Sequence, residues 1–138
     1  MDRTAKPFLD TNVLLNHILQ ENSGHGARAT AILERIEAGE LSVRTSDIVV
    51  SEAVFTLQRS YRVPREQIAS AVLQLLELPG IELPSKSRYR SVFELYVSTG
   101  VGFADCFHTV MMGQLGITEV LSFDRDFDKL PGIQRREA

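Results

Sequence analysis

The sequence has one cysteine, no tryptophan, and no uninterrupted apolar run long enough to cross a membrane. A lone thiol forms no internal disulfide and no cysteine-rich metal cage, so we expect a soluble protein of a reducing compartment, the cytoplasm by default. Near the N-terminus, Asp10, Asn12 and Asn16 interrupt the apolar stretch, which argues against a signal peptide. A phosphate-binding glycine loop is also missing, because Gly24-His25-Gly26 and Gly100-Val101-Gly102 match neither the P-loop nor the dinucleotide-binding pattern.

An excess of basic charge is absent as well, since 15 Lys and Arg face 18 Asp and Glu and the net charge is -3. This excludes a chain that holds nucleic acid by bulk electrostatics, so any such contact has to be local. Tyr61 and Tyr89 lie beside local basic clusters, where they either stack a base or pack against the protein. Each cluster is either a solvated face or a phosphate contact, and the three clusters are Arg59, Arg62 and Arg65; Lys86, Arg88 and Arg90; and Arg135-Arg136.

Short apolar segments alternate with segments of helical periodicity, and the 138 residues, 43% of them hydrophobic, predict one globular domain over residues 1–138. Ser46 is expected to be an N-cap, Pro64 a first helical residue, Ser85 a helix cap, and Asn22-Ser23-Gly24 a helix break. The expected helices are 13–18, 29–38, 47–57, 64–78, 86–99 and 104–115, and the expected strands are 7–9, 41–43, 81–83, 118–122 and an edge strand at Ile133. Helical crossovers between short strands predict an α/β, three-layer domain with a central, mostly parallel sheet flanked by helices.

Four acidic residues stand where chemistry is expected. Asp10 and Asp124 directly follow predicted strands, the place where α/β sheets bind ligands. Glu52 and Asp105 lie among apolar neighbours in predicted helices, and burying a lone carboxylate is costly unless it is paired or binds a metal. Other interpretations stay open: Asp10 as a helix cap, Glu52 as an ion pair with Arg59, and Asp105 as a complement to the helix dipole. If the four converge, they form a site for Mg²⁺ or Mn²⁺.

The run from Asp124 to Asp128 places acids at alternate positions, as a calcium-binding loop does. Lys129 stands where that loop needs Gly, and Arg135 stands where it needs a bidentate Glu, so the calcium interpretation fails. Asp126 and Asp128 are therefore interpreted as solvated or helix-capping residues, or as residues with an auxiliary role beside Asp124.

Four segments that contain these acids resemble, in order and approximate spacing, the acidic motifs of PIN-domain ribonucleases, and the length and layout resemble VapC-type toxins. The segments are Phe8-Leu9-Asp10-Thr11-Asn12-Val13-Leu14-Leu15, Ser51-Glu52-Ala53-Val54, Phe103-Ala104-Asp105-Cys106 and Ser122-Phe123-Asp124-Arg125-Asp126-Phe127. The resemblance implies a metal-dependent endoribonuclease that uses one or two Mg²⁺ or Mn²⁺ ions. By position the metal-binding and catalytic acids are Asp10, Glu52, Asp105 and Asp124, Thr11 or Asn12 shapes the first loop, and Asp126 or Asp128 supplements Asp124.

The same resemblance implies an RNA substrate, a homodimer, and a small antitoxin protein whose tail covers the acidic site. Helices within 27–38 and 47–60 have apolar positions that either line a groove for this partner or belong to the core. Two alternatives remain: a PIN fold that binds RNA or a partner without cutting, and a phosphoacceptor signalling domain. The second lacks a paired acid next to Asp10 and a Lys soon after the strand expected at 118–122.

Overall fold

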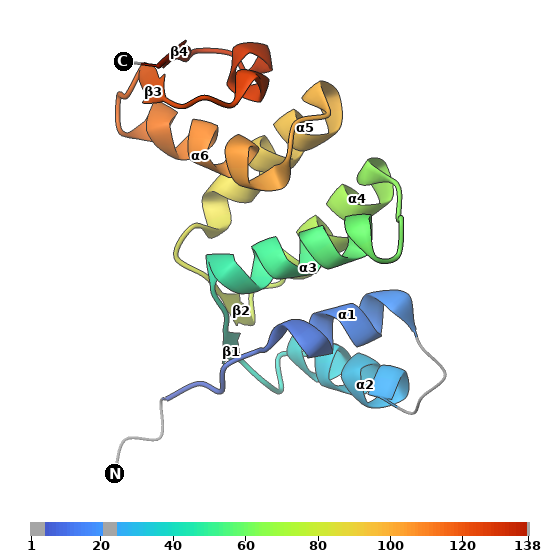
Figure 1. Cartoon of the computed structure of the whole chain (residues 1–138). Coiled ribbons are helices and arrows are strands. Elements are labelled where there is room, and N and C mark those ends of the chain that lie inside the picture. Colours follow the sequence, from blue (N-terminus) through green and yellow to red (C-terminus); the bar gives the residue numbers. More distant parts are fainter. Residues whose placement is uncertain (1–4, 21–24, 138) are drawn as a thin grey trace. The chain divides into compact units, whose positions relative to one another are not determined.

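The structure, a computed structural model, describes residues 5–20 and 25–137 (Figure 1). The chain divides into two compact units, unit 1 over Met1–Lys86 and unit 2 over Ser87–Ala138. Within the described ranges every strand pair is parallel, so the predicted α/β class with parallel pairing is confirmed. The helix break expected at 22–24 lies outside the described residues, and one domain over 1–138 stays a prediction.

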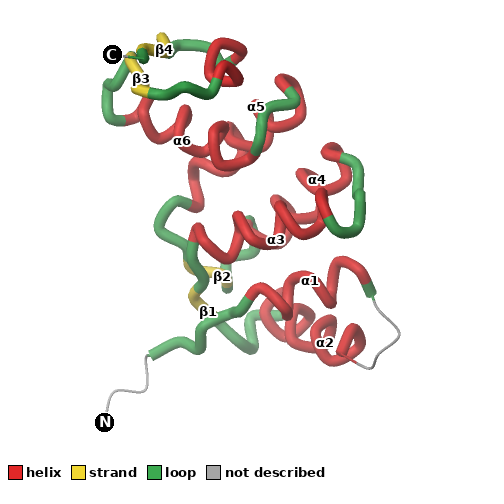
Figure 2. Tube along the Cα trace, in the orientation of Figure 1, coloured by secondary structure: helices red, strands yellow, loops and turns green. Residues whose placement is uncertain are grey.

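Unit 1 places two strands beside a layer of helices (Figure 2). Helix α1 packs against both α2 and α3, and α3 packs against α4. The helices are α1 (Thr11–Leu19), α2 (His25–Glu37), α3 (Asp47–Arg59) and α4 (Arg65–Leu76), and the strands are β1 (Val43–Arg44) and β2 (Ile81–Glu82). The helical ranges agree with the apolar periodicity, because the residues that repeat every three or four positions are the buried ones.

The predicted first strand is reduced to one parallel bridge, in which Phe8 pairs with Arg44. The backbone N–H of Leu9 donates to the carbonyl of Arg44 at 2.7 Å, and the chain then leaves the strand edge at Asp10. Strands β1 and β2 pair with Val43 opposite Ile81. The core beneath them consists of Leu9, Leu14, Leu33, Ile36, Val43, Val49 and Ile81. This packing fixes the start of α1 against the strands and so positions Asp10.

Local capping decides where the helices begin. The Ser46 hydroxyl accepts the backbone N–H of Val49 at 3.3 Å, which confirms the predicted N-cap of α3. Pro64 is the N-cap of α4 and not its first residue, because its ψ of 147° is extended. The prediction for Ser85 is wrong: a 3-10 helix, η1 (Lys86–Arg88), precedes α5, whose N-cap is Arg88, and the Ser85 hydroxyl instead donates to Asp47 at 2.9 Å.

Unit 2 is built on two helices that pack through an aromatic cluster. Its elements are α5 (Tyr89–Thr99), α6 (Phe103–Gln114), β3 (Glu119–Leu121), η2 (Arg125–Lys129) and β4 (Gln134–Arg136). The ring of Tyr89 lies 6.3 Å from Phe103 and 5.8 Å from Phe107, and Tyr89 is fully buried. The interpretation of Tyr89 as a residue that stacks a base is therefore wrong. Strands β3 and β4 pair in parallel with Val120 opposite Arg135, and β4 begins at Gln134, one residue beyond the edge strand expected at Ile133.

Candidate active site

Asp10 is the N-cap residue of α1, the position that its interpretation as a helix cap predicted. Its side chain nevertheless makes no capping hydrogen bond, and the residue is exposed. The backbone N–H groups of the first helical turn favour an anion at this place. Because capping does not engage its oxygens, the Asp10 carboxylate can bind a cation.

Glu52 is joined to the first acidic segment by a hydrogen bond. The Thr11 hydroxyl donates to Oε2 of Glu52 at 3.3 Å, across the contact between α1 and α3. Thr11 is 7% exposed, so its hydroxyl is held in place by the packing around it. Since Thr11 directly follows Asp10, the tertiary fold of unit 1 brings together two acidic segments that lie 42 positions apart in the sequence.

The expected apolar burial of Glu52 is wrong, because the structure leaves this residue exposed. Its neighbours Val50 and Val54 are buried on the opposite side of α3, while Phe55 is 62% exposed. In the described residues no ion pair joins Glu52 to Arg59, whose guanidinium carbon lies 5.8 Å from the centroid of the Phe55 ring. The carboxylate is thus presented to solvent and held by Thr11.

Asp105 and Asp124 form a second carboxylate pair, within unit 2. Asp105 lies in the first turn of α6 and is half-buried, and Asp124 follows β3 as the N-cap of η2. Burial raises the pKa of Asp105, and the negative charges of Asp124 and Asp126 and a side-chain hydrogen bond with Asp124 raise it further, whereas His108 lowers it. A half-buried carboxylate with a second carboxylate beside it is suited to bind a cation.

The loop after β3 is fixed by its own hydrogen bonds. Oδ1 of Asp124 accepts the backbone N–H of Asp126 at 2.9 Å, and the backbone N–H of Asp124 donates to the Ser122 hydroxyl at 2.9 Å. These two hydrogen bonds fix the position of Asp124 at the start of η2. Asp126 also forms an ion pair with Lys129 at 3.5 Å.

Asp128 is engaged away from this pair. The Arg135 guanidinium donates to both oxygens of Asp128, at 3.1 and 3.3 Å, and also pairs with Glu137 at 2.8 Å. A carboxylate that accepts two hydrogen bonds from one guanidinium serves mainly to join η2 to β4. Of the two auxiliary candidates, Asp126 is the one whose charge reaches Asp105.

Three of the basic residues that the sequence offered as phosphate contacts, Lys86, Arg135 and Arg136, have structural partners. The Lys86 ammonium donates to the backbone carbonyls of Leu78 at 2.6 Å and Ile81 at 2.8 Å. Burial lowers its pKa. Arg136 pairs with Glu119 at 2.9 Å, in addition to the pairs that Arg135 forms. Sequence reasoning missed these roles because the partners lie in other elements.

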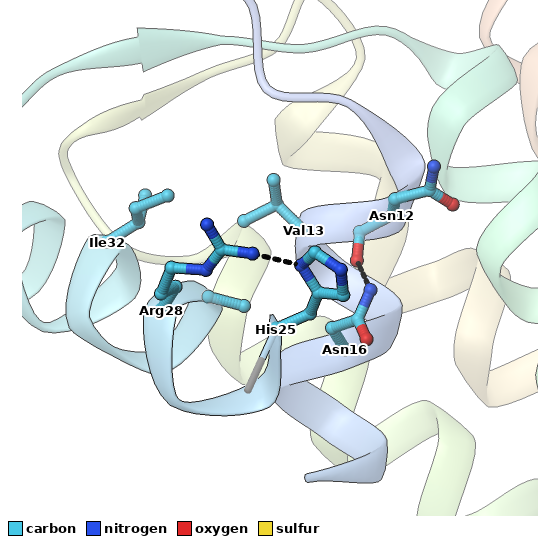
Figure 3. A pocket seen from close by; sticks show the side chains of 7 residues that line it. Asn12, Val13, Asn16, His25, Arg28 and Ile32 are labelled. Carbon is cyan, nitrogen blue, oxygen red and sulfur yellow. Dashed lines mark hydrogen bonds between the residues drawn. The ribbon is translucent and has the colours of Figure 1, made fainter. Parts of the chain in front are cut away.

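A pocket of about 390 Å³ lies beside the first acidic segment, lined by α1 and α2 (Figure 3). Arg28 donates to Nδ1 of His25 at 2.6 Å, and the Asn16 amide donates to the Asn12 carbonyl at 2.7 Å. Val13, Ala29 and Ile32 supply its apolar wall. The sequence offered apolar positions of the helices within 27–38 and 47–60 for a partner groove. In the structure α1 contacts both α2 and α3, and the pocket lies between α1 and α2.

Each unit thus brings two of the four acids to one place: Asp10 and Glu52 through Thr11, and Asp105 and Asp124 directly. Within the described ranges, no three His, Cys, Asp or Glu side chains gather closely enough to hold a metal ion. Asp105 lies inside α6 and not at a strand end, which is not the place of the acceptor in a phosphoacceptor domain. Among the helices of the described residues, none has the length and apolar character needed to span a membrane.

Comparisons with known proteins identify the family of the chain. The PIN domain family model matches residues 8–133, a range that includes all four acids and spans both units. A VapC ribonuclease of Aquifex aeolicus (strain VF5) is 33% identical over 125 residues, which cover 89% of this chain and 90% of that protein. The order and spacing of the acidic segments, the α/β architecture and this similarity lead to one conclusion: the chain belongs to the PIN domain family and is of the VapC type.

Proposed function

We propose that this protein is a metal-dependent endoribonuclease that cleaves RNA phosphodiester bonds, and that it is the toxin of a VapBC-type toxin–antitoxin pair. The observation that carries the proposal is the pair formed by Asp105 and Asp124: burial, and after it the neighbouring charge of Asp124, raises the pKa of Asp105. Such a pair is unfavourable by itself and becomes favourable beside a cation. Family membership and the similarity to a VapC ribonuclease give the reaction class.

Carboxylate oxygens are the ligands that Mg²⁺ and Mn²⁺ prefer, so the chemistry of the four side chains fits one or two such ions. Asp10, Glu52, Asp105 and Asp124 are the residues that we assign to hold them. A bound divalent ion supplies a nucleophile at neutral pH by lowering the pKa of water, and it neutralises charge on the phosphate. In the described part of the chain, no Lys or Arg lies within ion-pair distance of any of these four carboxylates. Their oxygens are therefore not already neutralised by a basic side chain.

The remaining steps belong to the chain's own residues. The Thr11 hydroxyl holds the Glu52 carboxylate in a fixed orientation. The backbone N–H of Asp126, in η2, holds the Asp124 carboxylate in the same way. Glu52 or Asp124 orients the attacking water for in-line displacement at phosphorus. In this scheme Asp126 supplements Asp124, whereas Asp128 stays paired with Arg135.

The test is cleavage of a panel of purified RNAs by antitoxin-free protein, with Mg²⁺, with Mn²⁺, and with EDTA. Asp10→Asn keeps the shape of the side chain and removes its charge, and we expect it to abolish cutting. Asp128→Asn is the matched control, because Arg135 already engages this carboxylate, and we expect it to cut like the unsubstituted protein.

A second readout separates folding and metal binding from activity. Ligand that binds only the folded state raises the melting temperature, so Mg²⁺ or Mn²⁺ should stabilise the unsubstituted protein more than Asp10→Asn. RNA binding without metal-dependent cutting, by a folded protein whose melting temperature responds to metal, would refute the nuclease and support a non-catalytic PIN-fold binding module.

We further propose that the protein forms a homodimer and that a small antitoxin covers its acidic site. The pocket next to Asn12 supports this partner, because its apolar wall can bind an apolar side chain of the antitoxin and Arg28 can pair with an acidic one. The genomic test is a search for a short reading frame that overlaps upstream; coexpression with its product should give a stable complex that does not cut RNA. A complex that cuts as fast as the free protein would contradict this part of the proposal.

A further inference from the structure

Helix α3 exposes one narrow stripe of side chains, although most of its apolar residues are buried. Ile48 and Phe55 are 70% and 62% exposed, and Glu52 and Arg59 are exposed as well. These four residues follow each other at intervals of four, three and four positions, which places them on the same side of a helix. Because all four belong to one helix, their order is fixed: Ile48 lies one turn before Glu52, and Phe55 and Arg59 follow it.

Phe55 and Arg59 form a unit within this stripe. The guanidinium carbon of Arg59 lies 5.8 Å from the centroid of the Phe55 ring, a distance at which a cation is attracted to the ring face. In the described residues no carboxylate is recorded within ion-pair distance of Arg59. A large aromatic ring and an uncompensated positive charge are therefore presented to solvent together.

The stripe also contains Glu52, whose carboxylate Thr11 holds at 3.3 Å. Glu52 and Phe55 are separated by three residues, or about 4.5 Å along the helix axis, and Arg59 lies about 10 Å from Glu52 along the same axis. A nucleic acid strand whose scissile phosphate lies at Glu52 thus has an exposed ring and a cation within reach of its neighbouring nucleotides.

We propose that Phe55 and Arg59 form a stacking site for an unpaired base of the RNA substrate next to the cleaved bond; this inference rests on the proposed ribonuclease function. Unstacked RNA bases bind to aromatic side chains and to guanidinium planes, and the adjacent phosphate is attracted by the same Arg. Because the net charge of the chain is -3, binding of RNA has to depend on local contacts, and a ring with a neighbouring cation is such a contact.

A second copy of the chain fits this stripe less well. Self-association through Phe55 and Ile48 would cover Glu52 and Arg59, which lie between and beside them, and charged groups are costly to bury without partners. A stacked base leaves both charges in contact with water. Stacking is also tolerant of base identity, so the site adds affinity for unpaired RNA and little sequence preference.

The experiment uses single-stranded RNA oligonucleotides that carry 2-aminopurine at one position at a time, in EDTA so that no metal-dependent cutting occurs. Fluorescence of this base falls when it stacks on an aromatic ring, and anisotropy of a labelled end gives the dissociation constant. The unsubstituted protein should quench one position strongly. Phe55→Leu should remove that quenching and weaken binding about tenfold, whereas Phe55→Trp should keep both.

Ile48→Ala is the matched control, because it removes an equally exposed apolar side chain from the same stripe on the other side of Glu52. It should leave the quenching unchanged. Circular dichroism melts of all variants check that these exposed substitutions leave the protein folded.

Several results would overturn the inference. Equal quenching and affinity with Phe55→Leu would mean that no base stacks there, and unchanged metal-dependent cutting in the same variant would leave the nuclease intact while the stacking site fails. A Phe55→Leu variant that changes from dimer to monomer in light scattering, with RNA affinity unchanged, would show a self-association surface. If the unsubstituted protein neither binds nor cuts any RNA, the proposed function itself fails.

Discussion

Replacing Asp105 by Asn should make the metal-free protein more stable and abolish its cutting of RNA. In the structure, burial and the nearby charges of Asp124 and Asp126 disfavour the ionised form of Asp105 and raise its pKa. Asp105→Asn removes this charge, and its amide can donate to the Asp124 carboxylate, which the ionised Asp105 cannot do. The substitution also removes a ligand that we assign to the metal.

The size of the gain follows from the exposure of the pair. Asp105 is half-buried and Asp124 is exposed, so solvent screens their repulsion, and charge pairs in such positions contribute about 0.2–1 kcal/mol. We therefore expect Asp105→Asn to raise the free energy of unfolding by about 0.5–1 kcal/mol in EDTA at pH 7. For a chain of this length this corresponds to a rise of about 3 °C in the melting temperature.

The pH dependence provides the control. The folded protein holds the Asp105 proton more tightly than the unfolded chain does, so ionisation of Asp105 costs stability. This cost is absent below the ordinary Asp pKa of about 3.9 and develops as the pH rises through the raised pKa of the folded protein. The advantage of Asp105→Asn should therefore disappear near pH 3.5.

Urea denaturation and thermal melts of both proteins at pH 7 and pH 3.5, with EDTA and then with excess Mg²⁺, make the measurement. Mg²⁺ should stabilise the unsubstituted protein and have a smaller effect on Asp105→Asn. A variant that is less stable at pH 7 in EDTA, or that keeps its advantage at pH 3.5, would refute the reasoning.

Three further predictions follow from side chains outside this pair. Lys86→Met leaves two backbone carbonyls without their charged donor and should lower the free energy of unfolding by about 2 kcal/mol in urea denaturation. Lys86→Arg is the milder control, and equal stability of Lys86→Met would contradict the assigned role. Asp128→Asn breaks the bidentate pair with Arg135, so the melting temperature should fall while the rate of RNA cleavage stays unchanged; a loss of cleavage would place Asp128 among the catalytic acids. Burial lowers the pKa of His17, which forms a hydrogen bond with Thr30 at 2.8 Å, so the contribution of neutral His17 to stability should be complete above pH 6.5 and decrease as the pH falls below it. His17→Gln should weaken this decrease in melts from pH 7.5 to 5, and an identical slope would argue against the assignment.

Much of the fold could be read from local sequence rules. The Ser46 cap, the helical repeat of α3 and the short strand at Ile81 depend on residues within a few positions of each other, and the structure agrees with each of them. Pro64 is misplaced by only one position, because its extended ψ keeps it outside the helix that it precedes. Ser85 is wrong because its hydroxyl bonds to Asp47, a partner 38 positions away.

The candidate site shows the same division. The positions of Asp10 after a strand edge and of Asp124 after β3 follow from the order of strands and turns, which the sequence predicts. The apolar neighbours of Glu52 suggested burial, but the helical repeat places Val50 and Val54 on the opposite side of α3 and leaves Glu52 exposed. For Tyr89 the sequence left base stacking and packing open, and only the folded chain decides for packing, since rings from α6 cover it.

Patterns along the sequence are sufficient for the family, the α/β class, the helices and the identity of the acids, because these depend on periodicity, capping and the order of motifs. Which side chains have partners follows from the folded chain alone: Thr11 with Glu52, Asp105 with Asp124, Arg135 with Asp128, and Lys86 with two carbonyls. A hydrogen bond or a pKa shift depends on distances of a few ångströms between atoms of different segments of the chain, and no rule of sequence pattern contains those distances.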